Sequence, residues 1–162
     1  MRIGQGYDVH PFRQGRRLIL GGVSLEGEIG LAGHSDGDVL THAVIDALLG
    51  AAALGDIGGH FPSSDERWRD ADSIEMLKQV VKLIAQAGFR AVNVDVTVIA
   101  ERPRIAPHVV ALRQNLAMAL GVESARVSVK ATTTDGLGAL GRGEGIAAMA
   151  VVLLEELAGL SP

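Results

Sequence analysis

The stretch DGDVLTHAVIDALLGAAAL, residues 36–54, predicts the clearest helix of the chain. Its apolar residues recur at the three- and four-residue spacing of a helical face. These residues are Val39, Leu40, Ala43, Val44, Ala47, Leu48 and Ala51. Ser35 or Asp36 is placed to cap the first turn, and Gly55 is placed to end the helix. A helix over 36–54 is therefore the starting point of the predicted fold.

The remaining periodic segments predict an α+β fold. Further helices are expected over Ser73–Ala87 and Pro107–Leu120. Strands are expected over Ile3–His10, Arg17–Gly21, Val92–Val98, Ala125–Lys130 and Ile146–Leu154. Residues 92–98 alternate strictly between valine and polar residues, whereas 146–154 are apolar throughout and fit a helix or a strand; Val151 and Val152 favour the strand. We expect one mixed β-sheet with helices packed on one face and a β-α-β-type core.

Length and composition limit the classes of protein to consider. With 162 residues, 48% of them hydrophobic and 21% charged, residues 1–162 are expected to fold as a single domain. The net charge of −4 and the aromatic content of 3% exclude a basic or stacking surface for nucleic acid. Because the chain contains no cysteine, disulfides and thiol chemistry are excluded, and any metal must be held by oxygen and nitrogen.

Hydropathy argues against a membrane protein. The longest apolar run, Ile146–Leu154, is far shorter than the roughly 20 residues of a spanning helix, and the N-terminus lacks a signal-peptide pattern. We therefore expect a cytoplasmic protein without a membrane partner. A sheet covered by helices on one side leaves an apolar face that a second copy can bury, so we also expect a homo-oligomer.

A candidate metal site combines a strand with the predicted helix. Asp8 and His10 are two residues apart on a strand, so their side chains point to the same face. If the helix packs on that strand, His42 can join them in a three-ligand site with an open fourth position, as in catalytic zinc sites. Asp46, one turn further along, could orient a ligating imidazole. Two alternatives stay open: a surface His10 with a hydrogen-bonded interior His42, and non-haem iron in place of zinc.

Three loops offer groups that bind phosphate. Residues 33–38 supply free backbone N–H groups at the start of the predicted helix. Residues 130–135, KATTTD, cluster hydroxyls between a cation and a carboxylate, and residues 138–145 place Arg142 and Glu144 among glycines. Each loop also has a purely structural interpretation, as a capping loop, an edge strand or a tight connection. Together with the candidate metal site, they favour chemistry on a phosphate.

Several of these segments together resemble one enzyme family. They are GYDVHPF at 6–12, HSDGD at 34–38 followed by His42, DALLG at 46–50, GDIG at 55–58, KATTT at 130–134 and GRGEG at 141–145. In their order and spacing they resemble 2-C-methyl-D-erythritol 2,4-cyclodiphosphate synthases, and the resemblance covers essentially the whole chain. Several independent motifs that match at once are far more specific than any one of them.

The resemblance implies a phosphorus–oxygen lyase of the non-mevalonate route to isoprenoids. Its nucleotide-linked substrate would be 4-diphosphocytidyl-2-C-methyl-D-erythritol 2-phosphate, whose 2-phosphate attacks its own β-phosphorus and expels CMP. The product would be 2-C-methyl-D-erythritol 2,4-cyclodiphosphate. The resemblance also implies a homotrimer with active sites between neighbouring subunits.

The resemblance further implies a role for individual residues. Asp8, His10 and His42 would hold zinc or a similar divalent transition metal, and Asp135 would meet a magnesium or manganese ion on the diphosphate. His34 and Thr133 would stabilise the transition state. The substrate-binding residues would be Ser35, Asp56, Ile57, Gly58, Phe61, Asp65, Ala100, Pro103, Arg104, Ile105, Ala106, Ala131, Thr132 and Arg142. Among them, the cytidine pocket, residues 100–106 with 131 and 132, would come from the adjacent chain.

Three positions depart from the family pattern. Asp135 stands where many members have glutamate, Ser63 where a carboxylate is usual, and Ala139 where some members have a phenylalanine that lines a central cavity of the trimer. Two other functions remain open from the residues alone. One is a metal-dependent phosphohydrolase, and the other is a trimeric module that binds nucleotides without catalysis.

Overall fold

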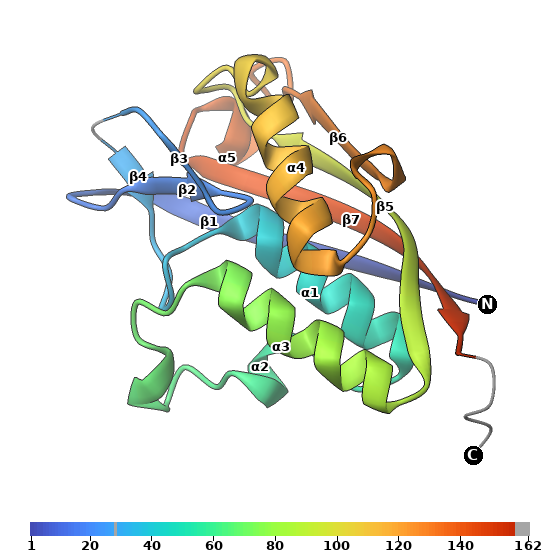
Figure 1. Ribbon diagram of the computed structural model, residues 1–162. Coiled ribbons are helices and arrows are strands. Elements are labelled where there is room, and N and C mark those ends of the chain that lie inside the picture. The colour runs from blue at the N-terminus through green and yellow to red at the C-terminus, as the bar shows by residue number, and fades with distance from the viewer. Residues whose placement is uncertain (28, 158–162) are drawn as a thin grey trace.

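The computed structural model describes residues 1–27 and 29–157, which form a mixed β-sheet with helices on one face (Figure 1). The strands are β1 (Arg2–Gln14), β2 (Leu18–Leu20), β3 (Val23–Leu25), β4 (Ile29–Leu31), β5 (Phe89–Ile99), β6 (Val127–Thr132) and β7 (Gly145–Glu156). The helices are α1 (Val39–Ala52), α2 (Ile57–His60), α3 (Ser73–Gln86), α4 (Val109–Leu120) and α5 (Gly138–Gly141). Short 3₁₀ turns lie at Glu66–Trp68, Ala106–His108 and Ser124–Arg126.

The main sheet has the strand order β4-β1-β7-β5-β6. Strands β5 and β6 are parallel and the other neighbours are antiparallel, which confirms the predicted α+β fold with a mixed sheet. A separate hairpin, β2-β3, was not expected. Gly21 and Gly22, both with positive φ, form its two-residue turn. Such a turn requires positive φ at both central positions, and glycine adopts it without strain.

Most predicted elements are present, but several begin or end elsewhere. Helix α3 confirms the helix predicted over Ser73–Ala87. Strand β7 confirms the strand interpretation of the apolar run Ile146–Leu154. Strand β1 continues past Pro11, whose carbonyl accepts a hydrogen bond from Ala32 N–H. The predicted starts of α4 and β6 were early by two residues, because 3₁₀ turns precede both elements.

The predicted bounds and cap of α1 were wrong. Asp38 is the N-cap residue, and its carboxylate accepts from Thr41 N–H, so the helix begins at Val39. The helix ends at Ala52 because Ala53 adopts a left-handed conformation, two residues before the predicted stop at Gly55. The sequence analysis considered Ser35 and Asp36 as caps and missed Asp38, which lies next to the first residue of the helix.

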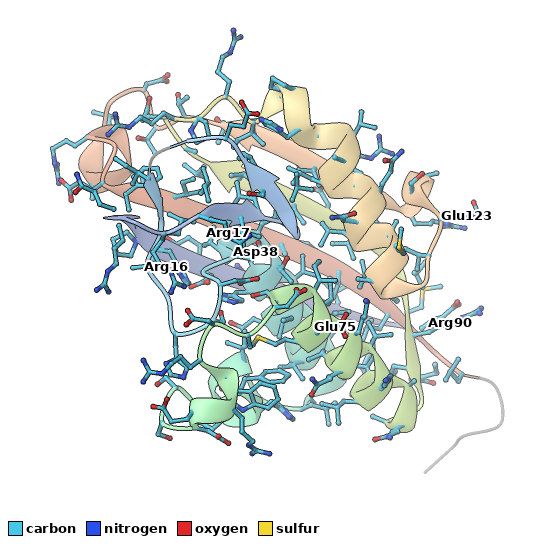
Figure 2. The ribbon with its side chains drawn as sticks, turned by 60° about the vertical axis from the view of Figure 1, so that its left-hand side comes forward. Arg16, Arg17, Asp38, Glu75, Arg90 and Glu123 are labelled. Atoms are coloured by element: carbon cyan, nitrogen blue, oxygen red, sulfur yellow. The ribbon has the colours of Figure 1, made fainter. Side chains whose placement is uncertain are left out.

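Asp38 also joins α1 to the hairpin. Its side chain is fully buried and accepts hydrogen bonds from the backbone N–H groups of Gly21 and Gly22, as well as from both the N–H and the hydroxyl of Thr41. Figure 2 shows Asp38 where the hairpin meets the start of the helix. This contact selects Asp38 as the cap, because a buried carboxylate requires several donors.

Two glycines of β1 allow α1 to lie directly on the strand. A Cβ atom at Gly4 would stand 2.6 Å from Ala51 N and would also overlap Ala47 O. A Cβ atom at Gly6 would stand 2.8 Å from Ala47 N and would overlap Ala43 O. Only a strand without side chains at these positions can approach the helix backbone so closely. The next two inward-facing residues of β1 are Asp8 and His10, so the glycines bring these side chains to α1.

Helices α1, α3 and α4 cover one face of the sheet (Figure 1), and the other face is apolar along β1 and β7. Its exposed large side chains on β1 and β7 are Ile3, Tyr7, Val9, Met149 and Val151, which are 45% to 74% exposed. They share one face because Tyr7 is paired with Met149 across the two strands. Exposed apolar surface of this kind marks a site of association. No helix among the described residues is long and apolar enough to cross a membrane.

Candidate functional site

Asp8, His10 and His42 converge as predicted. The helix places His42 against β1, and one ligand atom of each residue lies within 4.8 Å of the others. Asp8 Oδ2 is 2.8 Å from His10 Nε2 and 3.1 Å from His42 Nδ1, and the two nitrogens are 3.4 Å apart. Tetrahedral ligands at about 2.0–2.1 Å from zinc are about 3.3 Å from one another. The three atoms therefore have the spacing of three corners of a tetrahedral metal site.

The remaining atoms of the three side chains have other partners. Asp8 Oδ1 accepts from Val9 N–H, and His10 Nδ1 donates to the carbonyl of Ala32. His42 Nε2 lies 3.0 Å from Ser35 Oγ and 2.9 Å from Ser73 Oγ. Asp8 Oδ2, His10 Nε2 and His42 Nδ1 are thus the atoms that face one another. This donor set, one carboxylate oxygen and two imidazole nitrogens, suits a divalent transition metal.

The electrostatics of the site favour an ionised carboxylate. Burial opposes the charge of Asp8, but its contacts with His10 and His42 outweigh that effect and hold the pKa of Asp8 well below its usual range. Burial also opposes the charge of His10, yet its contacts with Asp8 and the Ala32 carbonyl raise the pKa of His10. Asp8 is therefore ready to bind a cation, whereas a metal must displace any proton on His10 Nε2.

A pocket of about 210 Å³ opens beside these three residues. Its lining includes the predicted residues His34, Ser35, Ile57, Gly58 and Phe61. It also contains Ser63, Trp68 and Met76. The structure therefore brings the predicted metal ligands and part of the predicted substrate-binding set into one cavity.

Two further predicted residues support this pocket from its edge. Asp56 caps α2 by accepting from Gly59 N–H. The carbonyl of Asp65 lies 3.3 Å from His34 Nε2, and the Asp65 carboxylate pairs with Arg67. Asp65 thereby fixes His34 at the mouth of the pocket.

The other predicted site residues form a second group. The parallel strands β5 and β6 end side by side, and Ala100 N–H donates to the carbonyl of Thr132. Glu101 holds the following loop by accepting from Thr134 and Gly136, and Thr133 Oγ1 donates to Asp135. The predicted residues near these strand ends or the adjoining loops are Ala100, Pro103, Arg104, Ile105, Ala106, Ala131, Thr132, Thr133, Asp135 and Arg142. In the described part of the chain none of them lines the pocket beside Asp8.

Two basic side chains in or next to this second group, Lys130 and Arg142, are paired within the chain. Lys130, which the sequence offered as a phosphate-binding cation, forms an ion pair with Asp95. Arg142 Nε lies 2.6 Å from Glu144 Oε1. Both pairs are exposed, so an anionic ligand could compete for these cations at small cost.

Comparison with known proteins identifies the chain. The model of the YgbB family matches residues 1–155. The chain belongs to the YgbB family. A relative from Syntrophomonas wolfei named 2-C-methyl-D-erythritol 2,4-cyclodiphosphate synthase is 59% identical over 156 residues, 96% of this chain and 99% of the relative. The resemblance found in the sequence is thereby confirmed.

Solved structures of the YgbB type agree in fold. The bifunctional IspDF from Campylobacter jejuni matches with a TM-score of 0.93 and 43% identity. The match covers 96% of this chain and 42% of the longer bifunctional chain. A 2C-methyl-D-erythritol-2,4-cyclodiphosphate synthase solved in a CDP-bound form matches with a TM-score of 0.87 and 36% identity, over 95% of this chain and all of that one.

Sequence reasoning on this YgbB-family chain missed the residues that hold His42. Asp46 was expected to orient a ligating imidazole, but its carboxylate accepts from Ile57 N–H and secures the start of α2. Ser35 and Ser73 occupy the far side of the imidazole instead. Ser73 is the first residue of α3, and the sequence predicted it only as the start of a helix.

Proposed function

We propose that this protein converts 4-diphosphocytidyl-2-C-methyl-D-erythritol 2-phosphate into 2-C-methyl-D-erythritol 2,4-cyclodiphosphate and CMP, as a metal-dependent phosphorus–oxygen lyase. The observation that carries the proposal is the convergence of Asp8, His10 and His42 at tetrahedral spacing beside a pocket. Membership of the YgbB family, with relatives named as synthases of this cyclic diphosphate, supports the proposed product.

The reaction requires one new bond between two phosphates of the same molecule. An oxygen of the 2-phosphate attacks the β-phosphorus, and the bond from that phosphorus to the oxygen bridging it to the α-phosphorus breaks, so that CMP leaves with the electron pair. Because nucleophile and electrophile belong to one molecule, most of the rate enhancement comes from holding them in place. A zinc-like ion on the three ligands would supply charge neutralisation at the β-phosphate.

Different residues of the chain would hold different parts of the substrate. His34 and Ser35, at the mouth of the pocket, would donate to phosphate oxygens, and His34 would stabilise the charge of the transition state. Ile57, Gly58 and Phe61 would enclose the erythritol. Closure of this pocket around the substrate excludes water, which would otherwise compete with the 2-phosphate as nucleophile.

The residues at the ends of β5 and β6 would act on the nucleotide side. Thr133 would bind the α-phosphate region and assist the transition state, while residues 100–106 would hold cytidine. Asp135, exposed and in a left-handed conformation, would meet magnesium or manganese on the diphosphate. Its short side chain suits contact through a metal-bound water.

The assay for this proposal is CMP release. The purified protein, supplied with zinc and magnesium, is expected to release CMP from the substrate and to form the cyclic diphosphate in equal amounts. Chromatography with mass detection measures both. Release of CMP together with only the uncyclised 2,4-bisphosphate would identify a phosphohydrolase, and binding of CMP without turnover would identify a nucleotide-binding module; either result would overturn the proposal.

We also propose that three copies assemble through the apolar sheet face and complete each site between neighbours. Two observations support this: the exposed apolar side chains of β1 and β7, and the separation of the two groups of site residues within one chain. A neighbouring chain would bring its residues 100–106 and 131–135 to the pocket beside Asp8.

Val151→Lys tests the assembly. Val151 is 46% exposed on the apolar face, so a charge there should leave the single chain folded but oppose burial against a second copy. We expect native mass spectrometry to show monomers, zinc to remain bound, and CMP release to fall at least about 100-fold, in line with loss of transition-state contacts worth about 3 kcal/mol. Lys78→Ala, on the opposite side of the fold, should remain trimeric. Full activity of monomeric Val151→Lys would contradict the shared site.

A further inference from the structure

The far side of the His42 imidazole is held by a chain of buried hydrogen bonds. Nε2 lies 2.9 Å from Ser73 Oγ, and Ser73 is fully buried. The Ser73 hydroxyl donates to Asp36 Oδ1, and the Ser73 backbone N–H donates to Asp36 Oδ2 at 3.0 Å. Asp36 Oδ1 also accepts from Asp38 N–H at 3.1 Å. Asp36 therefore links the loop before α1 to the first residue of α3.

The number of protons available in this series of hydrogen bonds determines which atom donates in each bond. Backbone N–H groups only donate, so both oxygens of Asp36 serve as acceptors. A serine hydroxyl has a single proton, and here that proton is donated to Asp36. The Ser73 oxygen can then only accept from His42. The contact between Ser73 Oγ and Nε2 is therefore a hydrogen bond only when the imidazole carries a proton on Nε2, and the neutral form held in this way has an unshared electron pair on Nδ1.

We propose that Asp36 and Ser73 are positioning residues that hold His42 as its Nε2–H tautomer and so present Nδ1 to a metal ion. His42 Nδ1 is the atom that faces Asp8 Oδ2 and His10 Nε2. Groups that hold a ligating histidine in this way typically change metal affinity about 10- to 100-fold. This inference rests on the metal site of the proposed function, and it adds that α3 controls a ligand borne by α1.

The same proton count indicates which hydrogen bonds Ser35 makes. Its Oγ lies 3.0 Å from His42 Nε2, which is already a donor, so the Ser35 oxygen accepts a share of that hydrogen bond. The Ser35 hydroxyl proton is then free to point elsewhere. Since Ser35 lines the pocket, that proton is available to an anionic group of a ligand.

The first experiment measures the tautomer directly in the unmodified, metal-free protein. Long-range ¹H–¹⁵N NMR spectra of histidine-labelled protein distinguish the two neutral tautomers at a pH where the imidazole is uncharged. We expect the His42 signal to show the Nε2–H form. A predominant Nδ1–H form, or an exchanging mixture, would overturn the proposal. The result is independent of turnover, so it stands even if the CMP assay fails.

The second experiment removes the Ser73 hydroxyl, which links His42 to Asp36. Ser73→Ala deletes the hydroxyl but keeps the backbone bond to Asp36, and we expect zinc to bind about 10- to 100-fold more weakly and the tautomer signal to become a mixture. The matched control is Asp72→Ala. It removes the neighbouring cap of α3, whose carboxylate accepts from Ile74 N–H at 2.8 Å, and leaves the hydrogen bonds among His42, Ser73 and Asp36 in place. Equal loss of zinc affinity in both variants, or unchanged affinity and tautomer in Ser73→Ala, would show that the hydroxyl does not position His42. If Ser73→Ala fails to fold, the tautomer of the unmodified protein decides.

Discussion

His42→Ala is expected to abolish metal binding and CMP release while leaving the chain folded. The substitution removes one of three ligands, so zinc affinity should fall well beyond the roughly 10- to 100-fold typical of lost supporting groups. A metal that neutralises developing charge contributes several kcal/mol, and about 1.4 kcal/mol corresponds to a tenfold change in rate. We therefore expect CMP release to fall by about 1,000-fold or more. Metal analysis of the purified variant and a CMP assay measure the two losses.

The fold should survive because the neighbours of His42 keep other partners. Asp8 retains His10 at 2.8 Å, and Ser73 retains Asp36. His60→Ala is the control, since it removes another imidazole, one that contacts the carbonyl of Leu54 and lies outside the pocket. That variant should keep its metal and its activity. A His42→Ala protein that still contains one zinc per chain would refute the ligand assignment.

The metal ligands could be predicted because each lies in a strongly periodic element. Two-residue spacing on a strand puts Asp8 and His10 on one face, and the helical pattern around His42 is unambiguous. What the sequence left undecided was whether the helix reaches the strand. The answer depends on Gly4 and Gly6, whose missing side chains allow contact between backbones, and that contact is visible only in three dimensions.

Residues that act through tertiary contacts could not be predicted. Asp36 and Asp38 are equally suited to cap a helix, and the hairpin turn at Gly21 and Gly22 selects Asp38 by supplying two more donors. Asp36 is then free to bind Ser73, 37 residues away. No local pattern connects these positions. Strand β2 lies within the predicted strand Arg17–Gly21, whereas the three-residue strands β3 and β4 were missed, since so few residues show no clear period.

The expectation of a site shared between chains follows from the resemblance and not from local pattern. The structure of one chain separates the pocket beside Asp8 from the ends of β5 and β6. Residues 100–106 and the threonine run are close to each other because β5 and β6 are parallel, an arrangement that alternation alone does not reveal.

Gly6→Ala is expected to cause a large loss of stability, although it adds only one methyl group. The new Cβ would stand 2.8 Å from Ala47 N and would overlap Ala43 O, and both belong to the backbone of α1. Backbone atoms cannot rotate away, so the helix must shift from the strand. Overpacking usually costs about 1–3 kcal/mol, and we expect about 3 kcal/mol or more here. For a chain of this length, that lowers the Tm by about 6–12 °C.

The control for this variant should change the stability in the opposite direction, so the two effects are easy to distinguish. Gly50 lies inside α1, and a Cβ added there would meet no atom within 4 Å, so Gly50→Ala should raise stability by up to about 1 kcal/mol through helix propensity alone. Thermal unfolding of both metal-free variants compares them directly, and zinc titration shows whether the shifted helix still presents His42 to Asp8 and His10. Because the glycines bring helix and strand together, Gly6→Ala should lose zinc affinity as well as stability. Unchanged zinc affinity in a destabilised Gly6→Ala protein would mean that the ligands converge without close packing of α1 on β1.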